Sequence, residues 1–353
     1  MKNQLKRIKL PKRKGAEEPE RPERITNDTV SKHRERILAG GRRFKYPIQY
    51  AKHKLIINSI IIVVVALVLM AVLIWQQLYV AQNTSKFMYR ITQIIPLPVA
   101  KVDGETVRYS DYLRDLRVDI STVQNLNQID MGSSSGDQQI NYYKRQELNK
   151  AERDAYARKL AEKMNLSVSD EEVDQVIDQQ RKAQHVSMDA YVKTAIEQYY
   201  GWSLGEYRDE IRARLIVKKV SFAVDDEAKQ RITNIQNQLD DHPDQFEDIA
   251  KKKSDDDATK ANGGRVGKLP IIGASDADDL VSVAKDMKEG QISDILKKPD
   301  GYYIIKLISK DDDSVDFAQI KIGLTKFDDM FAQIKADHKI VEYINIPEIK
   351  TQE

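Results

Sequence analysis

Apolar residues are distributed unevenly along the chain, and one long uninterrupted run stands out. Residues 55–75 contain no charged side chain and include the β-branched series from Ile60 to Val65. A helix of this length spans about 30 Å, which matches the hydrocarbon thickness of a bilayer. The run therefore predicts a single transmembrane helix over residues 55–75, with the lipid bilayer as its partner.

Beyond this run, apolar positions with helical spacing predict a mainly helical region. Alternation around Asp103-Gly104 indicates a β-hairpin over residues 99–107. Ser169 and Glu172 have the spacing of a capping box, which marks the start of a helix. Further helices are predicted over residues 110–120, 138–165, 188–200 and 204–220, and a loop over residues 132–137.

From residue 220 the pattern mixes short strands with helices. A strand is predicted at residues 220–224, and Pro299-Asp300-Gly301 predicts a turn between two antiparallel strands. Together these patterns predict an α+β fold, with a small, mostly antiparallel sheet flanked by helices. The expected helices are residues 227–239, 246–253 and 326–336, and the expected strands are residues 292–297, 302–308, 317–322 and 339–346.

The charge distribution orients the predicted membrane helix. Residues 1–54 hold 17 Lys and Arg against 6 Asp and Glu, whereas the remaining residues hold 40 against 49. Basic residues flank the cytoplasmic side of membrane helices, so the N-terminus is expected in the cytoplasm and the bulk of the chain outside it, in a single-pass cell-membrane protein. A cleaved signal peptide is the alternative, but Tyr79 is too large for position −3 of a cut after Ala81.

The basic tail, residues 1–54, is predicted to be disordered, because its Pro, Glu, Lys and Arg content leaves little to bury. Its basic clusters lack the interleaved aromatic residues of a nucleic-acid surface, so no nucleic-acid partner is expected.

The composition also excludes much chemistry. The chain has no cysteine, and its five histidines have no metal-binding spacing, so neither a metal nor another cofactor is expected. The two Asp triplets, residues 255–257 and 311–313, lack the ligand pattern of a calcium-binding EF-hand.

Five segments resemble the parvulin-type peptidyl-prolyl isomerase domain in order and spacing. The upstream part is similar to the helical chaperone domain of the bacterial SurA and PrsA foldases, through Val102-Asp103-Gly104-Glu105 and the region around Ser169. The resemblance implies a helical domain over residues 99–220, completed by residues 315–346, and an inserted parvulin-like domain over residues 221–310. The five segments are residues 246–250, 254–256, 259–264, 288–293 and 301–306.

Rotation about an X-Pro bond has a barrier of about 18–20 kcal/mol and needs no nucleophile or metal. A catalyst has to supply an apolar socket for the proline ring and a dry polar lining for the twisted amide. In parvulins, the resemblance implies, Met and aromatic side chains build the socket, and two histidines with a Cys or Asp form the lining.

Carried onto this chain, the family pattern is matched only in part. Asp256 occupies the Cys-or-Asp position, whereas Ser221 and Tyr303 stand where the two histidines belong. These three residues are the candidate catalytic positions. The candidate substrate groove consists of Leu269, Asp276, Leu280 and Met287, with Asp276 in place of the socket Met and Leu280 in place of a Phe. Peptidyl-prolyl isomerase activity is therefore expected to be weak or absent, and the sequence leaves open whether the chain is an enzyme.

The sequence thus predicts a membrane-anchored extracytoplasmic foldase that binds unfolded secreted polypeptides. Two alternatives stay open at this point. One is an active parvulin-type isomerase, which would act on Pro-containing chains, and the other is a single-pass envelope scaffold protein.

Overall fold

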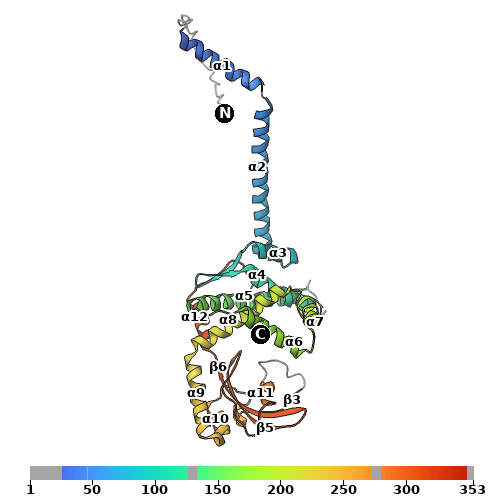
Figure 1. The fold of residues 1–353 in the computed structure, drawn as a ribbon, viewed down its shortest axis with the longest axis vertical. Helices are drawn as coiled ribbons and strands as arrows, with labels where there is room; N and C mark the ends of the chain where they lie inside the picture. The colour runs from blue at the N-terminus through green and yellow to red at the C-terminus, as the bar shows by residue number, and fades with distance from the viewer. Residues whose placement is uncertain (1–25, 46, 126–132, 272–279, 348–353) are drawn as a thin grey trace, which may run out of the picture. The chain divides into compact units, whose positions relative to one another are not determined.

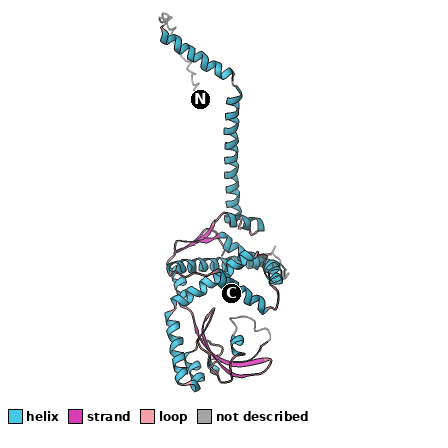
Figure 2. Cartoon of the chain, in the orientation of Figure 1, coloured by secondary structure: helices cyan, strands magenta, loops and turns pink. Residues whose placement is uncertain are grey.

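The computed structural model describes residues 26–45, 47–125, 133–271 and 280–347, and it divides the chain into two compact units, Met1–Leu73 and Ile74–Glu353. The chain contains runs of helices and two small antiparallel sheets (Figures 1 and 2), which confirms the predicted α+β class.

The first unit is built from two helices. They are α1 (Asn27–Lys45) and α2 (Pro47–Trp75), whose last residues belong to the second unit. The stretch His53–Val80 is long and apolar enough to cross a membrane, and its side chains are exposed from His53 to Leu73, whereas Leu78 is buried. The prediction of disorder is wrong for Asn27–Lys45, because Thr26 and Thr29 exchange hydrogen bonds at the start of α1 and Asp28 lies in its first turn. Residues 1–25 of the predicted tail lie outside the described residues.

The second unit begins with a helical domain. The predicted hairpin is confirmed, since its two strands pair in antiparallel fashion around Asp103 and Gly104. The capping box at Ser169 and Glu172 is also confirmed. The predicted loop at residues 132–137 is wrong from Ser134 onward, where a helix begins after the N-cap Ser133. The elements are η1 (Gln76–Val80), α3 (Lys86–Ile94), β1 (Pro98–Val102), β2 (Glu105–Arg108), α4 (Tyr109–Asn125), α5 (Ser134–Lys163), α6 (Asp170–Ala183), α7 (Met188–Tyr191), η2 (Val192–Tyr200) and α8 (Leu204–Val224).

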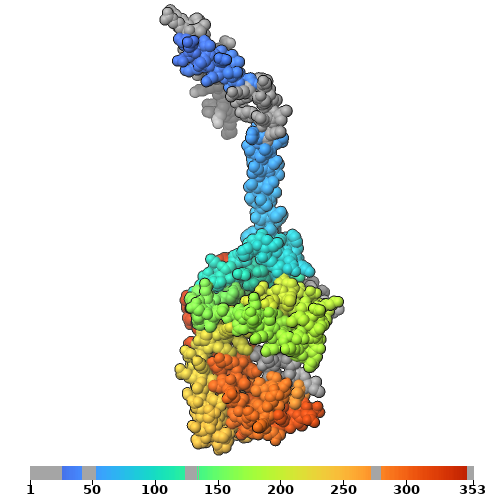
Figure 3. All heavy atoms as spheres, in the orientation of Figure 1, coloured from blue at the N-terminus to red at the C-terminus, as the bar shows by residue number. Residues whose placement is uncertain are grey.

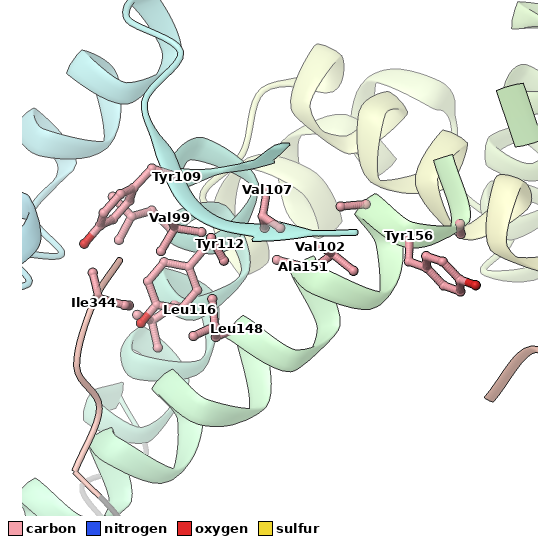
Figure 4. Close-up of a cluster of buried hydrophobic side chains, with 14 of the residues drawn as sticks. Val99, Val102, Val107, Tyr109, Tyr112, Leu116, Leu148, Ala151, Tyr156 and Ile344 are labelled. Atoms are coloured by element: carbon pink, nitrogen blue, oxygen red, sulfur yellow. The ribbon is translucent and has the colours of Figure 1, made fainter. Parts of the chain in front are cut away.

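The main core of this domain lies between the hairpin and helices α4, α5 and α8 (Figure 4). Tyr109, Tyr112 and Leu148 are fully buried there. The C-terminal segment contributes to the same core through α12 (Lys326–Ala336) and β7 (Ile340–Glu342). Phe327 of α12 stacks on Tyr156, and β7 pairs with β1, so residues far apart in the sequence share one hydrophobic interior.

Between α8 and α12 the chain forms a second layer around a four-stranded sheet of order β3-β6-β5-β4. Helices α9 and α10 cover one face of this sheet, and α11 covers the other. The elements are α9 (Asp226–Asp241), η3 (Pro243–Gln245), α10 (Phe246–Lys253), η4 (Lys260–Asn262), β3 (Arg265–Pro270), α11 (Leu280–Ala284), β4 (Leu296–Lys298), β5 (Gly301–Lys310) and β6 (Ser314–Gly323).

The predicted strand at residues 220–224 is wrong, because these residues form the last turns of α8. Val220 and Val224 are four residues apart, so a helix places both on one face, where they pack against the main core. Phe222 points to the other side and contacts Tyr302 of β5 with a ring separation of 4.9 Å. As a helix, this segment contributes side chains to two hydrophobic cores. These contacts outweigh the β preference of its residues. Residues 220–224 therefore do not join the sheet, and β6 is the strand that lies between β3 and β5.

Candidate functional site

The candidate site lies on one face of the four-stranded sheet. Tyr303, Ile305 and Leu307 alternate along this face of β5. Their antiparallel partners on β6 are Lys321, Gln319 and Phe317, respectively. The face is thus polar at the Tyr303 end and apolar at the Leu307 end.

Asp256 lies in the loop after α10, beside the polar end of this face. Its carboxylate accepts hydrogen bonds from the Gln319 amide at 2.6 Å, the Ala258 backbone N–H at 3.2 Å and the Thr259 hydroxyl. Partial burial raises the pKa of Asp256, but the hydrogen bonds from Thr259 and Gln319 outweigh it and hold the pKa below its usual value. The group is therefore ionised at neutral pH and acts as a hydrogen-bond acceptor.

The Tyr303 hydroxyl is engaged by a neighbouring ion pair. It donates to the carboxylate of Asp300 at 3.0 Å, and the same carboxylate pairs with the Lys321 ammonium, which lies 5.6 Å from the centre of the Tyr303 ring. Burial raises the pKa of Tyr303 to about 12, and the hydrogen bond to Asp300 adds to this shift while Lys321 opposes it. The phenol is therefore neutral, and its proton is directed at Asp300 rather than at an incoming peptide.

Three of the four predicted groove residues belong to one apolar cluster. Leu269 of β3, Leu280 of α11 and Met287 pack in one cluster with the strand residues Ile305 and Leu307. Met287, Ile305 and Leu307 are buried, whereas Leu269 and Leu280 are partly exposed. The fourth predicted residue, Asp276, lies outside the described residues.

Ser221 is not brought to this face. It is buried in α8, next to Phe222, which contacts Tyr302, and Tyr302 faces the sheet side opposite to Tyr303. The side chains that share the face with Asp256 and Tyr303 are Gln319 and Lys321 of β6. Sequence reasoning missed both, although it predicted a strand at residues 317–322, because that strand was assigned to the helical domain.

Two glycines allow β6 to pass close to its neighbours. Gly264 has a φ of +82°, and a Cβ at this position would lie 2.2 Å from the carbonyl oxygen of Gln319. A Cβ at Gly301 would lie 2.4 Å from the carbonyl oxygen of Ile322. The Gly-Gly and Gly-Tyr motifs of the sequence are therefore needed for the sheet to close around β6.

This sheet face combines an apolar surface with hydrogen-bonding groups, and catalysis of amide rotation needs both. However, the polar groups already bind one another. Among the described residues no group of three His, Cys, Asp or Glu side chains could hold a metal ion.

The fold and this sheet face define a parvulin-type domain that emerges from a helical, foldase-like domain. Comparison with known families agrees: residues 215–309 match the PPIC-type PPIASE domain, and residues 48–221 match the SurA-like N-terminal domain. The chain therefore carries both of the expected parts. β6, which fills the sheet beside β5, lies beyond the end of the first match.

Named relatives are foldases. The chain is 33% identical over 117 residues to the foldase protein PrsA of Clostridium kluyveri, a stretch that covers 33% of each chain. It is 27% identical over 180 residues to the foldase protein PrsA of Staphylococcus aureus strain bovine RF122, covering 42% of this chain and 55% of that relative. The chain thus matches between about a third and about half of the length of these relatives, and the similarity supports a foldase role of the parvulin type.

Proposed function

We propose that this protein is a membrane-anchored extracytoplasmic foldase that holds unfolded secreted polypeptides. Its helical domain provides the holding surface, and its parvulin-like domain isomerises X-Pro bonds feebly or not at all. The similarity to PrsA foldases supports the general role, and the observation that carries the holding function is an open cavity in the helical domain.

This cavity has a volume of about 560 Å³ and lies between α4, α5 and α8. Its apolar lining includes Ala161, Leu166, Ala213 and Ile216. Charged side chains of both signs surround these residues, namely Arg108, Asp111, Arg114, Asp154, Arg158, Glu162, Asp209 and Arg212. Apolar side chains next to charges of both signs accept apolar groups of a client without selecting one charge on it, which fits broad binding of unfolded chains.

The hydrogen bonds and ion pairs on the sheet face support feeble isomerase activity. The Tyr303 hydroxyl and the Lys321 ammonium both bind Asp300, and Asp256 is occupied by Gln319 and Thr259. A peptide would have to break these contacts before its twisted carbonyl could be stabilised. The predicted socket is also filled, since Ile305 and Leu307 are fully buried beneath α11.

Membrane anchoring is supported by the candidate span His53–Val80 and its basic N-terminal flank. The end of this helix is tied into the second unit, because Leu78 is fully buried and its carbonyl accepts a hydrogen bond from Tyr109. Trp75 stacks on Tyr79 with a ring separation of 6.4 Å, and both residue types are enriched at membrane interfaces. The positive-inside rule places the second unit outside the cytoplasm.

The holding function is tested by removing the parvulin-like part from the full chain. The Asp225 carboxylate accepts hydrogen bonds from the N–H groups of Thr325 at 3.0 Å and Lys326 at 3.1 Å, so the end of α8 and the start of α12 are neighbours. Deleting residues 226–324 and joining the ends with a short Gly-Ser linker should preserve the helical domain. The variant, in detergent, should delay aggregation of a reduced, unfolding client as well as the full chain does.

A second variant tests the cavity itself. Ala213→Trp places a large ring in it, and Asn234→Trp adds the same ring to an exposed position on α9. Loss of holding in the first variant alone supports the proposal. If both variants and the deletion hold the client normally, the cavity is not the client site. If the chain instead suppresses no aggregation and co-purifies with one fixed partner, it is a scaffold and the foldase proposal fails.

A further inference from the structure

Helix α3, which follows the membrane span, has an exposed apolar strip. Phe87 is 69% exposed and Ile94 is 82% exposed, although both are large apolar side chains. They lie seven residues apart, so a helix presents them on the same side. Lys86 and Arg90, four residues apart, lie beside this strip and are exposed as well.

The opposite side of α3 is fixed to the helical domain. Met88, Tyr89 and Thr92 are buried, and Tyr89 donates a hydrogen bond to Glu206 at the start of α8. The Glu206 carboxylate also accepts from the Gln93 amide at 2.6 Å. These bonds hold α3 in one orientation, so its exposed strip is a rigid feature of the second unit rather than the side of a loose linker.

A small basic cavity opens beside the same helix. It has a volume of about 180 Å³, and three cations, Lys86, Arg90 and Arg117, contribute to its lining. No acidic residue lines it, although Arg90 pairs with Glu206 next to the cavity at 3.4 Å and Arg117 donates a hydrogen bond to the Thr84 carbonyl. The other lining residues are polar or aromatic, and they are Tyr89, Ser121, Gln198, Tyr199, Tyr200, Gly201 and Trp202. Guanidinium and ammonium groups in a concave, aromatic setting suit a phosphate group.

The sequence places this surface next to the bilayer. The candidate span ends at Val80, only five residues separate it from Lys86, and five residues reach at most about 18 Å. Residues 36–102 contain no Asp or Glu, although the chain has 55 acidic residues in all. In the space-filling view the teal residues that follow the apolar stretch in the sequence lie at the surface of the second unit (Figure 3).

From these observations we infer that α3 lies in the outer leaflet surface, with Phe87 and Ile94 inserted among the acyl chains and an anionic phospholipid headgroup held by Lys86, Arg90 and Arg117. An amphipathic helix with an apolar strip beside cations binds membranes in this way. The contact orients the second unit on the membrane, in addition to tethering it. This inference rests on the proposed membrane anchoring.

Depth of insertion tests the apolar strip. The chain has no cysteine, so single substitutions Phe87→Cys and Ile94→Cys in the full chain can carry a nitroxide label after reconstitution into phosphatidylglycerol/phosphatidylcholine nanodiscs. Their accessibility to oxygen relative to a water-soluble nickel complex should resemble that of Val65→Cys in the span. Asn234→Cys on α9 serves as the solvent-exposed control. If positions 87 and 94 resemble position 234 while position 65 is protected, the inference fails and anchoring stands. If position 65 is also accessible to nickel, the anchoring proposal itself fails.

Lipid selectivity tests the basic cavity. Native mass spectrometry of the full chain from mixed phosphatidylglycerol/phosphatidylcholine micelles should show a preference for the anionic lipid. Arg117→Gln should reduce this preference roughly fivefold, and Lys86→Gln with Arg90→Gln should reduce it further. The matched control removes the same charge at Lys251 and Lys252, which are exposed on α10. An unchanged preference in the Arg117 variant, or an equal loss in the control, would overturn the headgroup site.

Discussion

The side-chain amide of Gln319 donates a 2.6 Å hydrogen bond to the carboxylate of Asp256, which lies 63 residues earlier in the chain. This bond joins the loop after α10 to the strand that occupies the sheet position beside β5. It also identifies Gln319, rather than Ser221, as the side chain that stands between Asp256 and the Tyr303 end of the sheet.

The first prediction concerns the missing histidines. Uncatalysed X-Pro exchange takes tens to hundreds of seconds at 25 °C, and we expect the wild-type protein to accelerate it only slightly. Ser221→His with Tyr303→His should give no gain, because residue 221 is buried in α8. Gln319→His with Tyr303→His should give a several-fold higher rate, because both rings then lie on the sheet face beside Asp256. A protease-coupled assay on a Pro peptide measures all three rates.

Tyr303→Phe is the control for a hidden activity. The Tyr303 hydroxyl donates a hydrogen bond to Asp300, so removing the hydroxyl should leave the low isomerisation rate unchanged. Strong wild-type catalysis that disappears in this variant would show that the polar cluster opens for substrate and that the chain is an active isomerase.

Several elements could be predicted because their signals are local. The repeat of Ala228, Ile232, Ile235 and Leu239 identified α9, and all four residues are buried in the sheet core. The spacing of Ser169 and Glu172 fixed the start of α6. A helix long and apolar enough to cross a membrane was evident from length and hydropathy alone.

The errors occurred where tertiary contacts override local preference. Residues 220–224 are mostly apolar and partly β-branched, as in a strand, yet the two cores on either side of α8 require a helix there. For the same reason the site was predicted only in part. Asp256 and Tyr303 share one sheet face, but their partners Gln319 and Lys321 lie on a strand whose position depends on long-range pairing.

The second prediction concerns Glu147, a buried glutamate of α5. Burial raises its pKa to about 8, and the neighbouring carboxylates Asp119 and Asp115 add to the shift. An unfolded glutamate titrates near 4.3, so between about pH 4.3 and 8 the folded state binds the extra proton and stability falls as pH rises. Glu147→Gln should therefore be more stable than the wild type by on the order of 2 kcal/mol at pH 8.5, with a small difference at pH 5.

Urea unfolding at the two pH values, followed through Trp202 fluorescence in a Trp75→Phe background, measures this difference. Glu197→Gln, at an exposed position of η2, is the matched control and should change the free energy of unfolding by the same small amount at both pH values. A Glu147→Gln gain that is equal at pH 5 and pH 8.5 would contradict the buried, protonated state.

The third prediction concerns the closeness of β3 and β6. Gly264→Ala should destabilise the parvulin-like part by about 2 kcal/mol or more, because its Cβ would meet the Gln319 carbonyl at 2.2 Å from a left-handed backbone. Gly205→Ala in α8 is the control, since its nearest neighbour would be 3.9 Å away and alanine favours a helix. Hydrogen exchange of the β5 and β6 amides should increase in the first variant only. Equal protection in both variants would show that the two strands are not this close.

The fourth prediction concerns topology. The basic residues before the span should keep the N-terminus in the cytoplasm, so that residues 101–353 lie outside. Protease added to intact, wall-stripped cells should digest this region while a cytoplasmic marker stays intact.

Replacing Arg42, Arg43 and Lys45 with glutamine and placing three lysines after Val80 should shift part of the population to the opposite orientation, because the balance of flanking positive charge sets the direction of insertion. Complete protection of the wild-type region, beside a digested outer-surface control, would contradict the topology. If digestion is unchanged when the flanking charges are exchanged, the basic tail does not set the orientation of the chain in the membrane.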